Sequence, residues 1–191
     1  LVMTEPRDEL DAGVVSRIMQ GDRAAFDQLI KCYERPIFNV AWRMLGSVTE
    51  AADATQNVFM KVFEHLHTYD SKHRLFSWVY RIAVNASLDR LKRRNRTSAS
   101  EDSVEDMPLQ SGERGPDEYF GHDQMHDLIQ AALMELQKDY RSVIVLRHFS
   151  ECHYGQIAEI LQIPEKTVKS RLYSARQVLR EKLSSRGVTS A

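Results

Sequence analysis

Residues 156–180 read QIAEILQIPEKTVKSRLYSARQVLR, and this stretch predicts two short helices joined by a tight turn. Apolar residues recur with helical spacing on both sides of Gln162, so each helix offers one apolar face to the other. They are Ile157, Ala158, Ile160 and Leu161 before the turn, and Ile163, Val168, Leu172 and Ala175 after it. We expect the second helix to begin at Pro164, because proline is tolerated in the first turn of a helix. We also expect a positive φ at Gln162, which costs about 1 kcal/mol for a residue other than glycine.

The outward face of the second predicted helix is basic. Its positions are Lys166, Lys169, Ser170, Arg171, Tyr173 and Arg176, with Arg180 one turn further on. A helix-turn-helix lays the first turns of its second helix in the major groove, where lysine, arginine and serine meet base edges and phosphates. Charged helix faces are often only solvated. Here the turn spacing, the small Ala158 and the basic face occur together, and this combination favours duplex DNA as the ligand.

The charge of the chain lies in two mildly basic blocks separated by an acidic segment. The 191 residues have a net charge of −1 and are 42% hydrophobic, which is enough for real cores. Basic and acidic residues number 15 and 12 in residues 1–97, 1 and 7 in 98–122, and 10 and 8 in 123–191, giving +3, −6 and +2. The middle segment has few large apolar residues, so we expect a flexible acidic linker. The basic blocks indicate nucleic acid as a partner.

Several functional classes are not supported. Cys32 and Cys152 are the only cysteines, so a disulfide framework is not available, and we expect Cys32 to be a small buried apolar residue. No apolar run could span a bilayer and no signal peptide is recognisable, so a cytoplasmic protein is expected. Motifs of nucleotide-binding loops, serine hydrolases and zinc proteases are lacking, and we expect no catalysis, no cofactor and no small-molecule substrate. Two groups of potential metal ligands are present, namely His122 with His126, and His148 with Cys152 and His153. Neither group supplies the four ligands of a structural zinc site.

Helical periodicity extends over most of the chain, and no alternation is long enough for a sheet, so the expected fold class is all-α. Residues 14–45 predict a short helix, a break at Gly21 with Asp22 as the next N-cap, and a longer helix bent near Pro36. Thr49 is expected to open the following helix. The helices expected beyond it cover residues 49–66, 75–91, 126–136 and 140–149, with a loop at 69–74.

The helix predicted over residues 75–91 leads into a dense positive tip. Five of seven consecutive residues there are basic, namely Arg90, Lys92, Arg93, Arg94 and Arg96. This exceeds what the helix dipole needs, so binding of phosphates is the better explanation. Upstream lie Arg74, Phe76, Trp78, Tyr80, Arg81 and Asn85. Aromatic rings among cations suit unpaired bases, which stack at about 1–3 kcal/mol each, although spacing alone favours core positions for Phe76 and Trp78.

Four segments read GDRAAFDQLIKCYERPIFNVAWRMLG (21–46), DATQNVFMKVFEHLHTYD (53–70), FSWVYRIAVNASLDRLKRR (76–94) and YRSVIVLRHF (140–149), the last running into the helix-turn-helix with TVKSRL (167–172). Together, and in this order, they resemble bacterial RNA polymerase sigma factors of the extracytoplasmic-function group. The similarity covers most of residues 13–183. It implies a factor that directs core RNA polymerase to particular promoters.

The resemblance also implies which residues meet which partner. The clamp helices of the largest polymerase subunit would be bound by Asp53, Gln56, Asn57, Phe59 and Lys61, with the polymerase flap as a further contact. Residues 70–74 and the aromatic set above would capture a base of the minus-ten element, with Arg90, Lys92, Arg93 and Arg94 on the backbone. The helix-turn-helix would read the minus-thirty-five element. An anti-sigma factor, often membrane-bound in this family, would hold the protein inactive until a stress signal.

The expected organisation is two small helical domains joined by the acidic linker. The segments are an N-terminal tail (1–12), a sigma region 2-like domain (13–96), the linker (97–122), a sigma region 4-like domain (123–186) and a C-terminal tail (187–191). One alternative is a stand-alone helix-turn-helix regulator, which would bind a two-fold symmetric operator without polymerase. Another is a helical interaction module, which would leave both cationic surfaces without a role.

Overall fold

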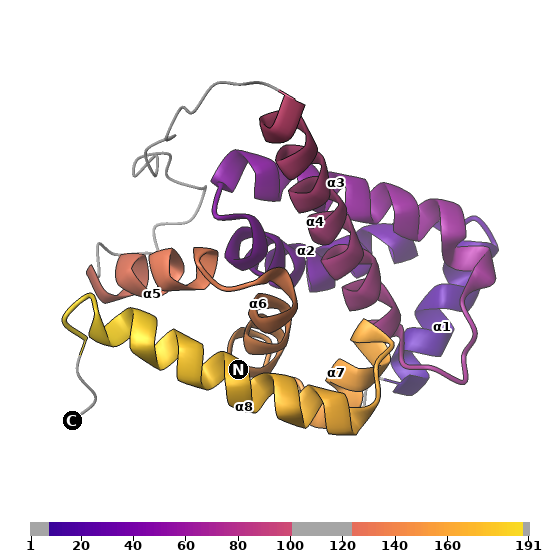
Figure 1. Cartoon of the computed structure of the whole chain (residues 1–191). Coiled ribbons are helices and arrows are strands. Elements are labelled where there is room, and N and C mark those ends of the chain that lie inside the picture. The colour runs from indigo at the N-terminus through magenta and orange to yellow at the C-terminus, as the bar shows by residue number, and fades with distance from the viewer. Residues whose placement is uncertain (1–7, 101–123, 189–191) are drawn as a thin grey trace.

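The computed structural model describes residues 8–100 and 124–188, and within these ranges every regular element is a helix (Figure 1). The predicted all-α class is confirmed. The first range contains α1 (Asp8–Met19), α2 (Arg23–Leu45), α3 (Val48–His65), the short 3-10 helix η1 (Leu66–Thr68) and α4 (Leu75–Ser100). The second contains α5 (Gln124–Met134), α6 (Lys138–Ile144), the π-helical turn η2 (Val145–Phe149), α7 (Tyr154–Leu161) and α8 (Glu165–Ser184).

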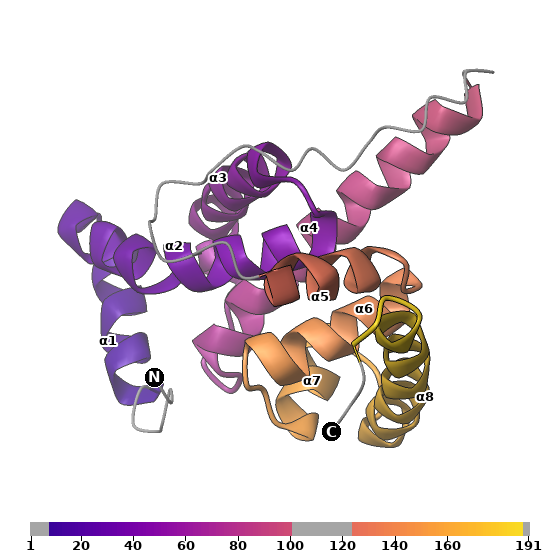
Figure 2. The ribbon, with the colours of Figure 1, turned by 90° about the vertical axis from the view of Figure 1, so that its left-hand side faces the viewer.

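Two groups of helices, which we call the N-lobe (α1–α4) and the C-lobe (α5–α8), pack against each other (Figure 2). Helix α2 contacts α1, α3 and α4 within the N-lobe and α5, α6 and η2 across the boundary, while α7 lies on α4. The buried apolar residues of both lobes form one continuous core. The division into two independently folding domains stays a prediction, and residues 101–122 of the expected linker lie outside the described ranges.

Helix boundaries in the N-lobe follow local capping chemistry. The break at Gly21 is confirmed, with a φ of 88°, and the Asp22 carboxylate caps α2 by accepting from the amide of Ala25 at 3.2 Å. The predicted opening of α3 at Thr49 was wrong. Ser47 is the cap, since its hydroxyl accepts from the Glu50 amide at 3.3 Å.

Two further boundaries differ from the prediction. Helix α4 does not stop at residue 91 but continues to Ser100, because no glycine or proline interrupts its polar continuation. It therefore includes residues 97–100, which were expected to begin the linker. The single helix expected over residues 140–149 is instead α6 followed by the η2 turn. Residues 69–74 form the predicted loop between η1 and α4.

The helix-turn-helix at the end of the chain is confirmed. Ile157 and Ile160 of α7 and Val168, Leu172 and Ala175 of α8 are all buried, as two facing apolar stripes require. Gln162 ends α7 in the left-handed region, with a φ of 54°. Helix α8 begins at Glu165, one residue later than predicted, because Pro164 is its extended N-cap.

The prediction that Cys32 is buried was wrong, since its side chain is exposed. The buried positions along this part of α2 are Ala25, Leu29, Tyr33 and Ile37, which recur every fourth residue. Cys32 precedes Tyr33 by one residue and is therefore turned about 100° away from that stripe. Cys152, in contrast, is buried in the C-lobe.

Replacing Gln162 with glycine should raise the free energy of unfolding by up to about 1 kcal/mol, because glycine adopts a positive φ without the clash of a Cβ atom. Urea denaturation measures the change. Gln177→Gly is the matched control, since Gln177 is exposed within α8 and should lose about 1 kcal/mol. Loss of stability in both variants would contradict the strain assigned to the turn.

The two thiols should differ strongly in reactivity. Burial raises the pKa of Cys152 to about 12, so almost no thiolate forms at neutral pH, whereas Cys32 is exposed. Titration of the native chain with an aromatic disulfide reagent should modify one thiol quickly and the second only in denaturant. The Cys32→Ser variant should show no fast thiol. A fast thiol in that variant would contradict the burial of Cys152.

Candidate nucleic-acid interface

Helix α8 presents most of the predicted duplex-reading residues on its outer surface. Lys166, Lys169, Ser170 and Arg176 are exposed, and Tyr173 has 68% of its surface exposed. In Figure 1 the helix runs along the outer edge of the C-lobe. The side chains therefore line the face that a major groove would meet. Contact of each residue with DNA stays a prediction.

Arg171 differs from its neighbours on α8. Its guanidinium forms an ion pair with Asp139 of α6 at 2.9 Å, and only 30% of the side chain is exposed. Partly exposed ion pairs are worth about 1 kcal/mol or less, so phosphate or a base could compete for this arginine. In the structure it ties α8 to α6. Lys169 is also paired, with Glu165 at 2.7 Å, one turn earlier on the same helix.

His148 of η2 lies beside the same face. Burial, followed by the nearby charges of Arg176 and Arg147, holds the pKa of His148 below its usual value. The neutral ring accepts a hydrogen bond from Nε of Arg176 at 3.4 Å. This contact orients Arg176 along the surface of α8 and neutralises none of its charge.

The aromatic set predicted to capture a single strand is only partly accessible. Tyr80 is 3% exposed, and its hydroxyl is hydrogen-bonded to Ser150 of the C-lobe, so in this conformation no base can stack on it. Phe76 packs against Tyr80 with ring centroids 4.1 Å apart. Trp78 is half-buried against Tyr69, at 5.6 Å between centroids. The periodicity of α4 could not reveal this, because the C-lobe covers Tyr80.

The remaining predicted residues, on α4 and at the end of the loop before it, differ in exposure. Asn85 is exposed, while Arg74 and Arg81 are half-buried and Nε of Arg81 lies buried without a hydrogen-bond partner. Further along, Lys92, Arg93 and Arg94 are exposed toward the end of α4. Figure 2 shows that this end of the helix projects beyond the other helices. A projecting cationic helix suits the phosphate backbone.

The cationic tip of α4 lies next to α3. Arg90 pairs with Asp53 at 3.0 Å, and Arg94 approaches Glu50 at 3.8 Å. Asp53 is one of the residues predicted to bind polymerase. The predicted polymerase surface and the predicted backbone-binding surface are therefore adjacent, and a partner that takes Asp53 would release Arg90.

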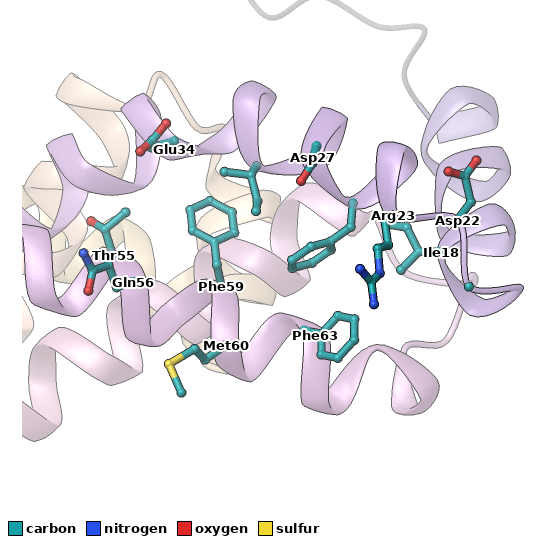
Figure 3. A pocket seen from close by; sticks show the side chains of 13 residues that line it. Ile18, Asp22, Arg23, Asp27, Glu34, Thr55, Gln56, Phe59, Met60 and Phe63 are labelled. Atoms are coloured by element: carbon teal, nitrogen blue, oxygen red, sulfur yellow. The ribbon is translucent and has the colours of Figure 1, made fainter.

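A groove of about 1010 Å³ lies between α2 and α3, reaching Ile18 of α1 (Figure 3). Gln56 and Phe59 line it, whereas the other predicted polymerase contacts, Asp53, Asn57 and Lys61, are exposed on α3 beside it. The acidic side chains on its border are Asp22, Asp27 and Glu34, and Arg23 is the one cation among the described residues that line it.

Sequence reasoning missed two apolar residues of this groove. Met60 is 60% exposed and Phe63 is 61% exposed, although Phe63 also makes an edge contact with Phe26 at 5.2 Å. Large apolar side chains exposed side by side mark an interaction surface. The sequence did contain a signal for them. Helix α3 has more large apolar residues than one buried stripe can hold, so some of them must be exposed.

The described residues contain neither a metal-binding cluster nor a membrane-spanning helix. No group of three or more His, Cys, Asp and Glu side chains there could hold a metal ion. Neither range, 8–100 or 124–188, contains a helix long and apolar enough to cross a membrane.

Comparison with known proteins matches both lobes. The family model Sigma-70 region 2 matches residues 29–97, and the model Sigma-70, region 4 matches residues 126–179. The chain is 30% identical to the ECF RNA polymerase sigma factor SigW of Bacillus subtilis over 176 residues, which is 88% of this chain and 94% of that one. It is 29% identical to the RNA polymerase sigma-H factor of Pseudomonas aeruginosa over 178 residues, or 90% and 92% of the two chains.

One solved structure agrees with these matches. The sigma factor RpoE of Bartonella quintana, solved in complex with the anti-sigma factor NepR, superimposes with a TM-score of 0.69 at 26% identity. The similarity covers 83% of this chain and 96% of that one. The predicted family is confirmed, and this chain belongs to the extracytoplasmic-function group of RNA polymerase sigma factors.

Proposed function

We propose that this sigma factor directs core RNA polymerase to promoters through two DNA contacts, one from each lobe. The observation that carries the proposal is the separation of two cationic surfaces, on α8 and on the projecting end of α4. Helix α8 would read the duplex minus-thirty-five element. Helix α4 and the loop 69–74 would hold the separated strand of the minus-ten element. A factor that works on polymerase and DNA acts in the bacterial cytoplasm.

The two DNA contacts would have different roles in initiation. Duplex contacts from α8 position the polymerase, because phosphates fix register and base edges add specificity. Contacts from α4 favour the melted strand, since extruding a base costs a few kcal/mol that stacking and phosphate binding offset. Opening is thus favoured only where the strand fits α4. The chain supplies binding and orientation, and polymerase supplies the chemistry.

The groove between α2 and α3 is the surface we assign to core polymerase. Its exposed Met60 and Phe63 offer apolar contacts, and its acidic border favours a partner with basic residues. An amphipathic helix fits such a surface, because its apolar residues at every third or fourth position enter the groove. Membership of the family implies that the clamp helices of the largest polymerase subunit are this partner.

An anti-sigma factor is the second protein partner we propose. The related RpoE of Bartonella quintana was solved with the anti-sigma factor NepR, and the match extends over 96% of that chain. A partner bound to the groove or between the lobes would block polymerase. A stand-alone regulator is not favoured, because the described residues contain one helix-turn-helix and, apart from it, an aromatic and basic surface on α4.

Run-off transcription with purified core polymerase and a genomic promoter library tests the proposal. The chain should confer selected start points, and Met60→Asp should abolish them by weakening polymerase binding at least about tenfold, because a charge would enter an apolar contact. Met125→Asp is the matched control on α5, where Met125 is 43% exposed. Absence of selected starts, with tight binding of a palindrome by the chain alone, would overturn the proposal.

Lys166→Ala should weaken binding to minus-thirty-five duplex at all salt concentrations. It should also reduce the slope of log affinity against log salt concentration by the amount that corresponds to about one phosphate contact. Fluorescence anisotropy across a salt series measures both quantities. Lys182→Ala is the control, because Lys182 lies near the other end of α8 and pairs with Glu135 at 2.9 Å. Equal effects of the two variants would contradict the placement of α8 in the groove.

A further inference from the structure

The exposed cations of α8 belong to a basic cluster that extends onto η2 and the start of α7. The ring of Tyr154 links two of its members, since the ring centre lies 5.4 Å from the guanidinium of Arg147 and 5.7 Å from Nζ of Lys169. His148 follows Arg147 along η2 and meets α8 at a second point. The basic cluster comprises Arg147, His148, Lys169 and Arg176.

The backbone after η2 holds the cluster members of that turn beside α8. Nη1 of Arg147 donates to the carbonyl of Cys152 at 3.0 Å, and the amide of Cys152 donates to the carbonyl of Leu146 at 2.9 Å. Between them the chain passes through Glu151, which has a φ of 54°. Turns of π-helical form occur often at functional sites, because they direct side chains that a regular helix would place elsewhere.

Arg176 lies in the part of α8 where phosphates, and not base edges, are the expected ligand. It follows the first residue of α8, Glu165, by eleven positions, which corresponds to about 16 Å along the helix axis. A helix-turn-helix reads bases with the first turns of its second helix, and residues further along lie near the flanking backbone. Because Arg176 is exposed, a phosphate can reach it.

The contact between Arg176 and His148 depends on the protonation of the imidazole. Nε of Arg176 donates to Nε2 of His148 at 3.4 Å, which requires a lone pair on Nε2 and therefore a neutral ring. This hydrogen bond is long, whereas an arginine donates to phosphate at about 2.7–2.9 Å. A phosphate would therefore replace the ring as the acceptor. Once protonated, Nε2 becomes a donor and can bind the same phosphate.

Both charges that act on the His148 ring are positive. Burial, followed by the charges of Arg176 on α8 and Arg147 on η2, holds the pKa of His148 below its usual value. A phosphate bound at Arg176 would offset that positive charge and raise the pKa again. On the other elements packed against η2, Arg43 of α2 lies over the ring of Phe149, Asp139 of α6 pairs with Arg171, and Tyr154 of α7 faces Arg147.

We propose that His148 is a proton-linked positioning residue for duplex binding: the neutral ring holds Arg176 along α8, and the protonated ring joins Arg176 on one phosphate of the DNA backbone. Binding of duplex DNA is accompanied by uptake of a proton at His148. The role of His148 rests on the proposed duplex contact of α8 and deepens it.

The proton uptake predicts the direction of the pH dependence. The pKa of His148 is higher in the complex than in the free chain, so the gain in affinity begins as the pH falls through the pKa of the complex. It is complete below the pKa of the free chain. Because one proton is taken up, the gain is at most about tenfold for each pH unit.

Fluorescence anisotropy with a fluorescein-labelled duplex of random sequence, at fixed low salt, measures this dependence. Random sequence is suitable because phosphate contacts do not depend on the bases. The unaltered chain should bind several-fold more tightly at about pH 5.5 than at about pH 7.5. His148→Gln keeps an acceptor for Arg176 but cannot titrate, so it should match the unaltered chain within about twofold at the higher pH and lose the gain at the lower pH.

Two further variants separate positioning from charge. His148→Ala removes the acceptor as well, so it should bind about threefold more weakly than His148→Gln at the higher pH, because Arg176 is no longer held. His153→Asn is the matched control, since His153 is exposed at the N-cap of α7 and asparagine suits an N-cap. This variant should keep the pH dependence of the unaltered chain.

An equal pH dependence in the unaltered chain and in His148→Gln would overturn the proposal, and so would its loss in His153→Asn alone. Lys166→Ala distinguishes this failure from that of the proposed function. If Lys166→Ala weakens binding and His148→Gln keeps the pH dependence, the duplex contact of α8 stands and the role of His148 fails. If Lys166→Ala binds normally and His148→Gln loses the pH dependence, the groove contact fails and the phosphate contact at His148 stands.

Discussion

Helix α2 determines where the other elements lie, because its buried stripe supports both lobes. Leu29, Tyr33, Ile37 and Val40 lie inward, and the helix packs on α1, α3 and α4 before its end meets α5, α6 and η2. An apolar stripe of this length is shielded from water only if helices of both the N-lobe and the C-lobe cover it. The positions of the groove, the strand-binding surface and the lobe boundary all follow from this one packing requirement.

The cations of the chain fall into two physical classes. Most of those on α8 and on the tip of α4 are exposed, and their ion pairs lie at the surface, so they can exchange water or a carboxylate for phosphate at little cost. Arg43 and Arg141 are buried, and their charges are met by carbonyls, an amide and aromatic rings. The first class is the one that we propose binds DNA. The second makes the arrangement of the lobes sensitive to small changes in their surroundings.

Features set by local chemistry could be predicted from the sequence. The break at Gly21, the cap at Asp22 and the positive φ of Gln162 each depend on a few neighbouring residues. Features set by distant contacts could not be predicted. Tyr80 is covered by the C-lobe, whose Ser150 lies seventy positions further along the chain, and the arginines of the boundary look like any surface arginine in the sequence. Ser47 and Thr49 are both common cap types, and the sequence alone does not show which of them the fold uses.

The buried cations also bear on how firmly the two lobes are held together. Carbonyls and aromatic faces replace only part of the hydration that a buried arginine loses. Among the described residues neither Arg43 nor Arg141 pairs with a carboxylate, which reduces the stability of the boundary, although their hydrogen bonds have fixed directions. A well-matched ion pair at the same place would hold the lobes together more firmly. Carbonyl and aromatic partners therefore give a boundary whose geometry is specific and whose stability is modest.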